Sequence, residues 1–444
     1  MMKKLLLAAY VMIISLVNMV SIHAQEISPY LFGQNHWLAD RDEGRTGYLH
    51  LLWDKVEASG VKTIRIGGNG YEHHFPSREK LNQMIDTIRS IGAEPLLQVP
   101  RSFSALQAKE LVEYYTKSES RKVNLWSIGN EPMLHDRNTL EEVHEFILRI
   151  AYAMKEVAPE IRIFVFDGAN LKVPAYAALC GGELDITGLK QNGSWLIDGI
   201  SFHNYPNGRE FDRDDIVFTG PDKIRKEIEI LTQLIQQANA KHGRAGEEAL
   251  LWGLTEFNVT YVNPNREISG YGNPSFLGGQ FIAEIFGYGM EYGACVMNPW
   301  CINETDVVRT DFGYLGFPRE FYPRSSYYHM QMMSDYLTGK YIHSTDNQGY
   351  VKTVAATSQN GISLLIMNQH AEEDFDFEIS LNGQGNHSDM SLKIAVDAGI
   401  EKTYSGSIPN QTSRILVFNK AGELQREVNY SLGHNLKNPP PEVK

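Results

Sequence analysis

Two glutamates, each at the end of a short apolar run, are the side chains of this sequence best placed for chemistry. Glu131 lies in the stretch WSIGNEP at residues 126–132, and Glu256 lies in LTEFN at residues 254–258. A strand that ends on a carboxyl group presents that group at the rim of a sheet. If the fold brings the two strand ends together, one carboxylate can attack a carbon centre while the other carboxyl group, in its protonated form, assists the leaving oxygen. That is the chemistry of glycoside hydrolysis.

The elements that must position these glutamates alternate between short apolar runs and helical patterns. The runs predict strands at residues 31–37, 61–66, 95–99, 124–130, 161–166, 196–202, 250–255 and 294–299. Amphipathic stripes follow most of them, clearest around residues 140–154 and 224–235 and weakest around 173–179. An eighth helix is expected near residues 326–337. Strand and helix units in this order predict an α/β fold, a (β/α)8 TIM barrel.

After Gly339 the apolar period changes from that of a helix to two residues. Phe375, Phe377, Ile379 and Leu381 alternate with polar residues, as residues of a half-buried strand do. We therefore expect a catalytic barrel over residues 25–338, followed by a small C-terminal β-sandwich over residues 339–432 that packs against it. Residues 433–444, which end in PPPEVK, are expected to be a loose tail.

Residues 1–24 have the pattern of a cleavable secretory signal peptide. Lys3 and Lys4 precede an apolar run from Leu5 to Val20, and the small-residue exit SIHA leads to Gln25. A membrane anchor is the alternative, although the run is short for a spanning helix. The pattern predicts an exported protein, secreted or periplasmic. Because no cysteine follows the cleavage point, nothing supports a lipoprotein.

Composition limits the partners of the chain. Hydrophobic residues make up 42% and charged residues 21% of the sequence, as in soluble globular proteins. The formal net charge is −13, and it becomes −15 when the signal removes two lysines. This balance argues against nucleic acid and anionic membranes as partners. No segment after residue 24 is long and apolar enough to span a bilayer.

No pattern in the sequence predicts a metal or a cofactor. Cys180, Cys295 and Cys301 lack metal-site spacing and are expected to be buried thiols. A disulfide between the last two would require the chain to fold back. The stretch GGNG at residues 67–70 is followed by neither a P-loop lysine nor a dinucleotide fingerprint. The adjacent His73 and His74 would point to opposite sides of a strand, so they do not predict a metal pair.

In a TIM barrel, the C-terminal strand ends surround one active-site mouth. Besides the two glutamates, the predicted ends carry Asn69, Asn130, His203, Asn204, Tyr205, Asn298 and Trp300. A polar residue at a single strand end is commonly only a helix cap. Two glutamates with a histidine, a tyrosine and a tryptophan at one rim indicate instead a catalytic site.

Asn130-Glu131-Pro132 at strand four and Thr255-Glu256-Phe257-Asn258 at strand seven resemble the signatures of the retaining glycoside hydrolases of clan A. These are the "4/7" TIM barrels, and the resemblance covers residues from about 30 to 335. It implies that Glu131 is the general acid/base, that Glu256 is the nucleophile, and that Asn130 hydrogen-bonds the sugar 2-hydroxyl.

Four further residues match the clan A pattern. His203 and Tyr205 match strand six, where the tyrosine often contacts the nucleophile, and Trp300 matches the aromatic floor after strand eight. Arg65 matches the strand-two arginine that supports the nucleophile, although it lies inside the strand. Hydrogen bonds from Tyr205 and positive charge from Arg65 would favour an ionised Glu256, while burial would keep the acid/base protonated.

The substrate is read less directly than the reaction. We expect a β-glycosidic bond in a polysaccharide or oligosaccharide, with a preference for endo attack on a β-glucan. Clan A also includes xylanases, agarases, β-glucuronidases and α-L-arabinofuranosidases, and a non-catalytic glycan-binding barrel is a further alternative. Aromatic residues in the loops after strands six to eight would shape subsites or merely pack the loops: Tyr261, Tyr271, Phe312, Tyr314 and Phe317. The sequon Asn258-Val259-Thr260 adjoins Glu256, where a glycan would obstruct the mouth, so we expect an unmodified bacterial protein.

Overall fold

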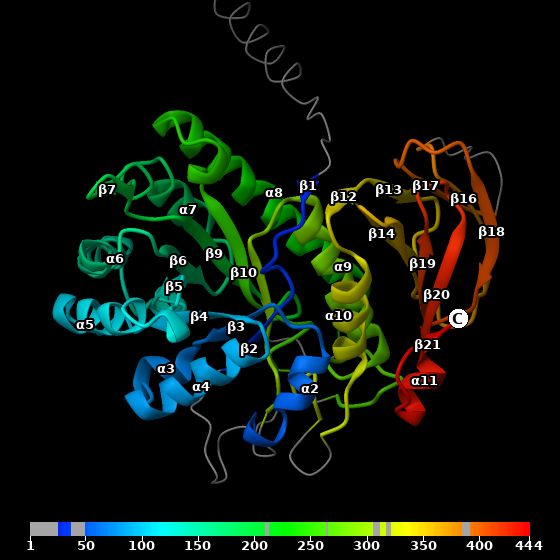
Figure 1. The fold of residues 1–444 in the computed structure, drawn as a ribbon, viewed down its shortest axis with the longest axis horizontal. Helices are drawn as coiled ribbons and strands as arrows, with labels where there is room; N and C mark the ends of the chain where they lie inside the picture. The colour runs from blue at the N-terminus through cyan, green and yellow to red at the C-terminus, as the bar shows by residue number, and fades with distance from the viewer. Residues whose placement is uncertain are drawn as a thin grey trace, which may run out of the picture.

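The structure is a computed structural model that describes residues 25–36, 49–208, 213–262, 265–304, 311–316, 321–383 and 391–444. The predicted signal peptide lies outside the described residues, as do Trp37 at the end of the first predicted strand and Phe317. A barrel and a β-sandwich lie side by side, with helices α9 and α10 between them (Figure 1).

Eight parallel strands form the barrel, as predicted. They are β2 (Gly33–His36), β3 (Thr63–Ile66), β4 (Glu94–Val99), β5 (Leu125–Ile128), β6 (Arg162–Gly168), β9 (Gly199–Asn204), β10 (Leu251–Phe257) and β11 (Val296–Pro299). Their order in the sheet is β11-β10-β9-β6-β5-β4-β3-β2. A parallel bridge between Phe32 and Met297 brings the first strand beside the last and closes the barrel.

Helices follow the strands and cover the outside of the barrel. They are α2 (Trp53–Ala58), α4 (Arg78–Ser90), α5 (Ala105–Thr116), α6 (Leu140–Val157), α7 (Val173–Leu179), α8 (Ile216–His242), α9 (Phe276–Glu291) and α10 (Ser325–Tyr336). Short elements in the connections are α3 (Asn69–His73), the hairpin strands β7 (Lys190–Gln191) and β8 (Ser194–Trp195), and 3-10 turns at Leu49–Leu51, Glu119–Arg121, Leu134–Asp136 and Gly246–Glu248.

Helix α6 shows how the sequence sets a helix. Thr139 caps its first turn in a capping box with Glu142, which satisfies backbone N–H groups that have no partner within the helix. Its apolar stripe, including Val143, Ile147 and Ile150, is buried against the barrel. Burying each such side chain contributes about 1.5–3 kcal/mol, so packing rather than helix propensity holds the element in place.

Two sheets form the C-terminal sandwich. The larger has the order β1 (Gln25–Glu26), β12 (Lys340–Ile342), β14 (Val351–Ser358), β15 (Gly361–Asn368), β19 (Thr412–Phe418), β20 (Leu424–Ser431) and β21 (Glu442–Val443). The smaller has the order β13 (Ser344–Asp346), β17 (Leu392–Val396), β16 (Phe375–Ser380) and β18 (Thr403–Ile408). Phe377 and Ile379 point inward between the sheets and are buried, as their alternation predicts.

Both ends of the described chain join this sandwich. Residues 25–26 pair with β12, so the N-terminal strand lies beside the C-terminal domain. The expected tail over residues 433–444 is instead ordered: α11 (Leu432–Lys437) leads to β21, which pairs with β20. The pairing supplies hydrogen-bond partners to the outer edge of β20, which the polar and proline-rich composition of the tail did not predict. The division at residues 338 and 339 stays a prediction.

Polar contacts fix the sandwich to the last helices of the barrel. Gln280 on α9 donates hydrogen bonds to the backbone carbonyl of Asn368 at 3.2 Å and to Ser413 Oγ at 3.0 Å. His329 on α10 lies 2.7 Å from the same Ser413 Oγ. The sandwich therefore packs against α9 and α10, which follow the strands that carry the second half of the candidate site.

The cysteines are confirmed as buried free thiols. Within the described ranges, no helix combines the length and the apolar character that crossing a membrane requires.

Candidate active site

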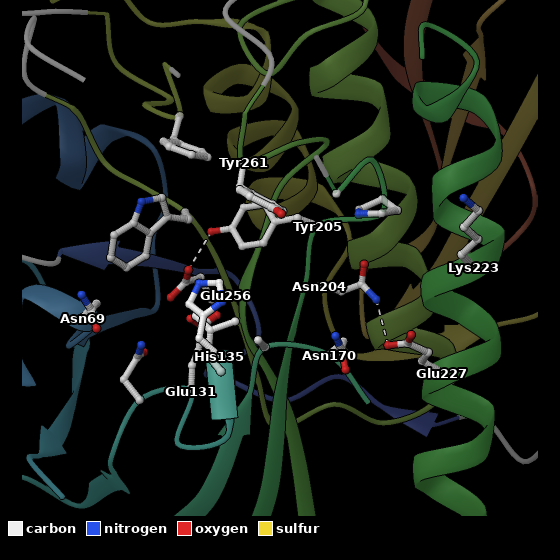
Figure 2. Close-up of a pocket in the computed structure, with 17 residues that line it drawn as sticks. Asn69, Glu131, His135, Asn170, Asn204, Tyr205, Lys223, Glu227, Glu256 and Tyr261 are labelled. Atoms are coloured by element: carbon white, nitrogen blue, oxygen red, sulfur yellow. Dashed lines mark hydrogen bonds between the residues drawn. The ribbon is translucent and has the colours of Figure 1, made fainter. Parts of the chain in front are cut away.

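A cavity of about 640 Å³ opens at the C-terminal ends of the barrel strands. Six of the predicted site residues line it: Asn69, Asn130, Glu131, Tyr205, Glu256 and Trp300 (Figure 2). The other two, Arg65 and His203, are fully buried beneath it. The structure therefore brings together side chains from barrel strands that are far apart in the sequence.

Oxygen atoms of Glu131 and Glu256 lie within 4.8 Å of each other. Carboxyl groups about 5–5.5 Å apart suit direct attack on an anomeric carbon, whereas a separation of about 6.5–9.5 Å leaves room for a water. Glu131 has a positive φ of 44°, and Gly129 before it has a φ of 75°. Such a conformation is costly for a glutamate, and the backbone N–H of Glu131 is held by the carbonyl of Asp167 at 2.9 Å.

Glu256 receives hydrogen bonds on both carboxylate oxygens. Tyr205 Oη donates to Oε1 at 2.8 Å, and Arg65 donates to Oε2 at 3.4 Å. The pairing of β10 with β9 shifts register between Leu254 and Glu256. Bulges of this kind re-aim side chains next to active sites, and here the shift places the carboxyl group against the two donors.

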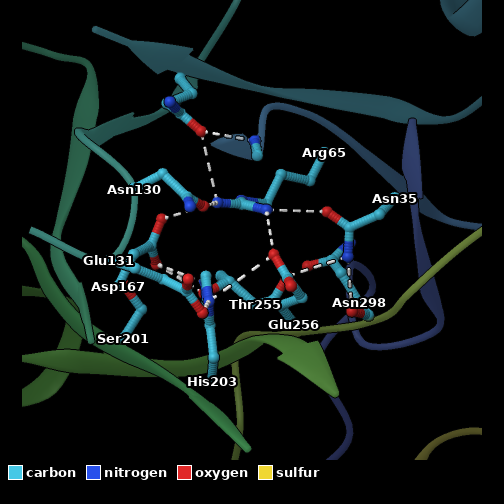
Figure 3. A network of polar contacts seen from close by, with 12 residues as sticks. Asn35, Arg65, Asn130, Glu131, Asp167, Ser201, His203, Thr255, Glu256 and Asn298 are labelled. Atoms are coloured by element: carbon cyan, nitrogen blue, oxygen red, sulfur yellow. Dashed lines mark hydrogen bonds and ion pairs between the residues drawn. The ribbon is translucent and has the colours of Figure 1, made fainter. Parts of the chain in front are cut away.

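Arg65 connects the strands beneath the cavity, as Figure 3 shows. Besides Glu256, its guanidinium donates to Asn35 at 2.9 Å, to Asn130 at 2.8 Å and to Asp167 at 3.2 Å. A buried charge costs several kcal/mol unless it is paired and hydrogen-bonded. The surrounding oxygens meet that requirement, so Arg65 is held as a fixed positive charge beside Glu256.

His203 lies between the two glutamates. Its Nδ1 is 3.1 Å from Glu131 Oε1 and 3.6 Å from Glu256 Oε2, and its Nε2 is 3.8 Å from Asp167 Oδ1. Burial opposes the charged imidazole, but the neighbouring carboxyl groups outweigh it and raise the pKa of His203. The ring can therefore hold a proton against Glu131.

Burial also acts on the acids of the site. It raises the pKa of Glu256, while His203, Arg65 and the Tyr205 hydrogen bond oppose the rise. Burial disfavours the charge on Asp167 too, but Arg65, His203 and two hydroxyl groups hold the pKa of that carboxyl below its ordinary value. The surroundings of Asp167 therefore favour its charged form.

No protein-family model matches the sequence, and no curated protein matches it. Solved structures do. A family 51 α-L-arabinofuranosidase from Bifidobacterium longum is similar with a TM-score of 0.63 at 12% identity, over 88% of this chain and 96% of that chain. A xyloglucanase of glycoside hydrolase family 44 from Paenibacillus polymyxa gives a TM-score of 0.58 at 12% identity, over 88% and 97%. A monomeric β-xylosidase from Caulobacter crescentus gives 0.57 at 14% identity, over 79% and 76%.

The chain shares the fold of these three enzymes. The identities are low, so the likeness is one of architecture: a (β/α)8 barrel with a C-terminal β domain.

Aromatic residues form one wall of the cavity. Trp300 follows β11, its indole N–H donates to Glu304 Oε1 at 3.2 Å, and its peptide bond to Cys301 is cis. Tyr261 and Phe312 make edge contacts with the ring of Tyr205, at centroid distances of 5.9 and 6.0 Å. They therefore also hold the ring whose hydroxyl reaches Glu256.

Asn69 lies at the start of α3, on the far side of the cavity from α8 (Figure 2). Its Oδ1 accepts a hydrogen bond from Arg137 at 3.0 Å. This contact ties the connection after strand two to the one after strand four, and Asn69 lines the cavity.

Asp167, Asn35 and Gln98 belong to the network but were not predicted as site residues. The predicted fifth strand stops at Phe166, one residue short of Asp167, whereas β6 runs to Gly168. Gln98 accepts from Arg65 at 3.3 Å. Asn35 donates to the backbone carbonyls of Thr255 and Asn298 and so joins the first strand to the last two. Polar residues near the ends of otherwise apolar strands are the signal that could have found all three.

Glu131, His203 and Glu256 offer three potential ligand atoms within 4.8 Å of one another, which is close enough for a metal ion. Carboxylate and imidazole groups are suitable ligands. Glu256, however, already accepts from the fixed cation of Arg65 and from Tyr205. The positive charge of Arg65, 3.4 Å from Glu256 Oε2, opposes a second cation beside that carboxylate.

Proposed function

We propose that this protein is a retaining glycoside hydrolase in which Glu256 is the nucleophile and Glu131 is the general acid/base. The observation that carries the proposal is the separation of the two carboxyl groups, within 4.8 Å, because it favours direct attack by one of them. The unequal surroundings of the pair support the assignment of roles. Glu256 accepts hydrogen bonds from Tyr205 and from the cationic Arg65, and both stabilise the carboxylate that a nucleophile requires.

In the first step, Glu256 attacks the anomeric carbon while the bond from that carbon to the leaving oxygen breaks and Glu131 protonates that oxygen. A glycosyl-enzyme ester results. In the second step, Glu131 takes a proton from water as the water attacks the anomeric carbon, and the carboxylate of Glu256 leaves. Two inversions at one carbon give net retention.

The surrounding residues support these steps. Arg65 and Tyr205 stabilise the charge on Glu256 before attack and again when the ester is released. Asn130, whose Oδ1 is held by Arg65, would bind the sugar 2-hydroxyl through its amide N–H. Trp300 offers an apolar surface to the sugar ring. His203, against Glu131, would hold the acid/base in position.

The substrate we propose is a β-linked polysaccharide or oligosaccharide, with endo attack on a β-glucan as the preferred mode. The structural neighbours support a wider set of test substrates, because they include an arabinofuranosidase, a xyloglucanase and a β-xylosidase. We also propose that the protein is bacterial and exported, as supported by the pattern of residues 1–24.

A reducing-sugar assay over a panel of β-glucans, xyloglucan, xylan, agarose and arabinan tests the proposal, with product lengths resolved by chromatography. Short oligomers in the first minutes indicate endo action, and single sugars indicate exo action. The double variant Glu131→Gln, Glu256→Gln is the control, and any release of sugar that it retains comes from a contaminant. Tight binding of a glycan without cleavage would instead favour a non-catalytic glycan-binding barrel.

A further inference from the structure

The cavity continues past the two carboxyl groups into a polar region that the reaction described above does not use. The order of the barrel strands divides the rim into two arcs. Between Glu131 after β5 and Glu256 on β10 lie the ends of β6 and β9, with Asn170 and Asn204. The other arc passes through β11, β2, β3 and β4, and it includes Trp300.

Asn130 and Trp300 together indicate which arc holds the sugar that is attacked. Asn130 Oδ1 accepts from Arg65 at 2.8 Å, which leaves its amide N–H for a sugar hydroxyl. A ring whose 2-hydroxyl meets Asn130 and whose apolar face meets Trp300 lies on the Trp300 side of the two glutamates. The leaving group must then lie on the β6–β9 side.

Glu227 on α8 lines the cavity on the β6–β9 side, where Figure 2 shows it beside Asn170 and Asn204. Its Oε2 accepts from Asn204 Nδ2 at 2.8 Å and from the backbone N–H of Leu171 at 3.4 Å. These two bonds fix the orientation of the carboxyl group. In the part of the chain that the structure describes, no donor reaches Oε1, and burial raises the pKa of Glu227.

We propose that Glu227 and Asn170 bind hydroxyl groups of the sugar on the leaving-group side. A carboxylate oxygen accepts hydrogen bonds from hydroxyls, and an amide both donates and accepts, so the two together suit a sugar rather than an apolar alcohol. The inference rests on the proposed function and makes it more specific, because it names the two residues that recognise the sugar beyond the bond that is cleaved.

The test compares two substrates with the same attacked sugar and different leaving groups. One is the oligosaccharide that the polysaccharide panel identifies, and the other is the 4-nitrophenyl glycoside of the same sugar. Glu227→Gln keeps an acceptor for Asn204 and Leu171 but removes the charge, and Glu227→Ala removes the acceptor. Glu229→Gln, on the same helix but outside the cavity lining, is the matched control.

We expect Glu227→Ala to lower kcat/KM for the oligosaccharide by roughly ten-fold to a hundred-fold, which is the effect of losing hydrogen bonds to a charged group. Glu227→Gln should show a smaller loss in the same direction. With either variant, kcat/KM for the nitrophenyl glycoside should stay within about two-fold of the wild-type value. The rate at which the glycosyl-enzyme is hydrolysed should not change, because the leaving group has departed by then.

Equal losses on both substrates would overturn the subsite, because they would show that Glu227 acts on the catalytic residues through Asn204. An unchanged kcat/KM on the oligosaccharide would overturn it as well. Either result leaves the proposed function standing. Failure of the wild-type protein to cleave both substrates would overturn the proposed function and this inference together.

Discussion

The hydroxyl group of Tyr205, after β9, donates a 2.8 Å hydrogen bond to Oε1 of Glu256 on the neighbouring strand β10. The bond stabilises the ionised carboxylate against burial, which raises its pKa. It is therefore the contact that most directly supports the proposed role of Glu256 as the nucleophile.

Tyr205→Phe should move the acid limb of the pH profile upward. Loss of the donor raises the pKa of Glu256 further, so less of the reactive carboxylate is present as pH falls. We also expect kcat to fall by roughly ten-fold or more, since the lost bond is to a charged group. The profile of kcat/KM against pH measures the limb, with Tyr336→Phe on α10 as a control distant from the site. An unmoved limb would show that the bond does not control ionisation.

Glu131→Ala should affect substrates according to their leaving groups. Poor leaving groups need a proton, which we propose that Glu131 supplies, so the rate on them should fall by roughly 10²–10⁴-fold. Activated aryl glycosides depart without it and should lose much less in the first step. A series of aryl glycosides of graded leaving-group pKa measures the dependence. Equal losses across the series would contradict an acid role.

Arg65 and Asp167 form a fully buried ion pair with a separation of 3.2 Å. Arg65→Met should lower the free energy of unfolding by about 3–5 kcal/mol, because two buried carboxyl groups then lose their cation. Asp167→Asn should cost less, since Glu256, Asn35 and Asn130 still contact the arginine. Denaturant titration of both single variants and the double variant measures the coupling. Strictly additive losses would show that the pair is not coupled.

The Arg65–Asp167 ion pair makes the stability of the fold depend on pH in the acid range. The pKa of Asp167 is below its ordinary value of 3.8 in the folded protein. The ionised Asp167 therefore contributes fully to the free energy of unfolding well above pH 3.8, and this contribution is lost as the pH falls through the lower pKa of the folded state. In Asp167→Asn this acid dependence should become weaker, and Tm measured between neutral and acid pH would reveal it.

Removal of metal ions by a chelator tests whether the site works without a metal. Glu131, His203 and Glu256 could hold an ion by their spacing, yet Arg65 already supplies positive charge to Glu256. Dialysis against EDTA should leave kcat/KM unchanged, and metal analysis of the dialysed protein verifies removal. Loss of activity that Zn²⁺ or Mn²⁺ restores would reassign the three residues as ligands.

Much of the fold could be predicted because a parallel barrel leaves a clear pattern. Buried strands such as β5 and β10 read as apolar runs, and their helices carry an apolar stripe. Since such strands end at one rim, the placement of Glu131 and Glu256 at the ends of two runs predicted that they would meet. Their separation and contacts required the structure.

The rest depends on contacts between distant segments. Asp167 is not distinctive in the sequence. Its place in the site comes from the hydrogen bonds that it accepts from Arg65 and from the Thr255 hydroxyl. The strand at residues 442–443 pairs with the outer edge of β20, and the tail's own sequence does not show that partner. Glu227 reads as a surface residue of a long helix, and only the cavity shows that it faces the site. Helical periodicity alone cannot distinguish a solvent-facing carboxyl group from one that lines a cavity.

The most direct test of the account is azide rescue of Glu256→Ala on an activated aryl glycoside. We predict that the variant alone loses nearly all activity, and that azide restores it by attacking the anomeric carbon in the space left by the carboxylate. The product should be a glycosyl azide of inverted configuration, identified by NMR. Full activity of Glu256→Ala without azide would contradict the assignment of Glu256 as the nucleophile.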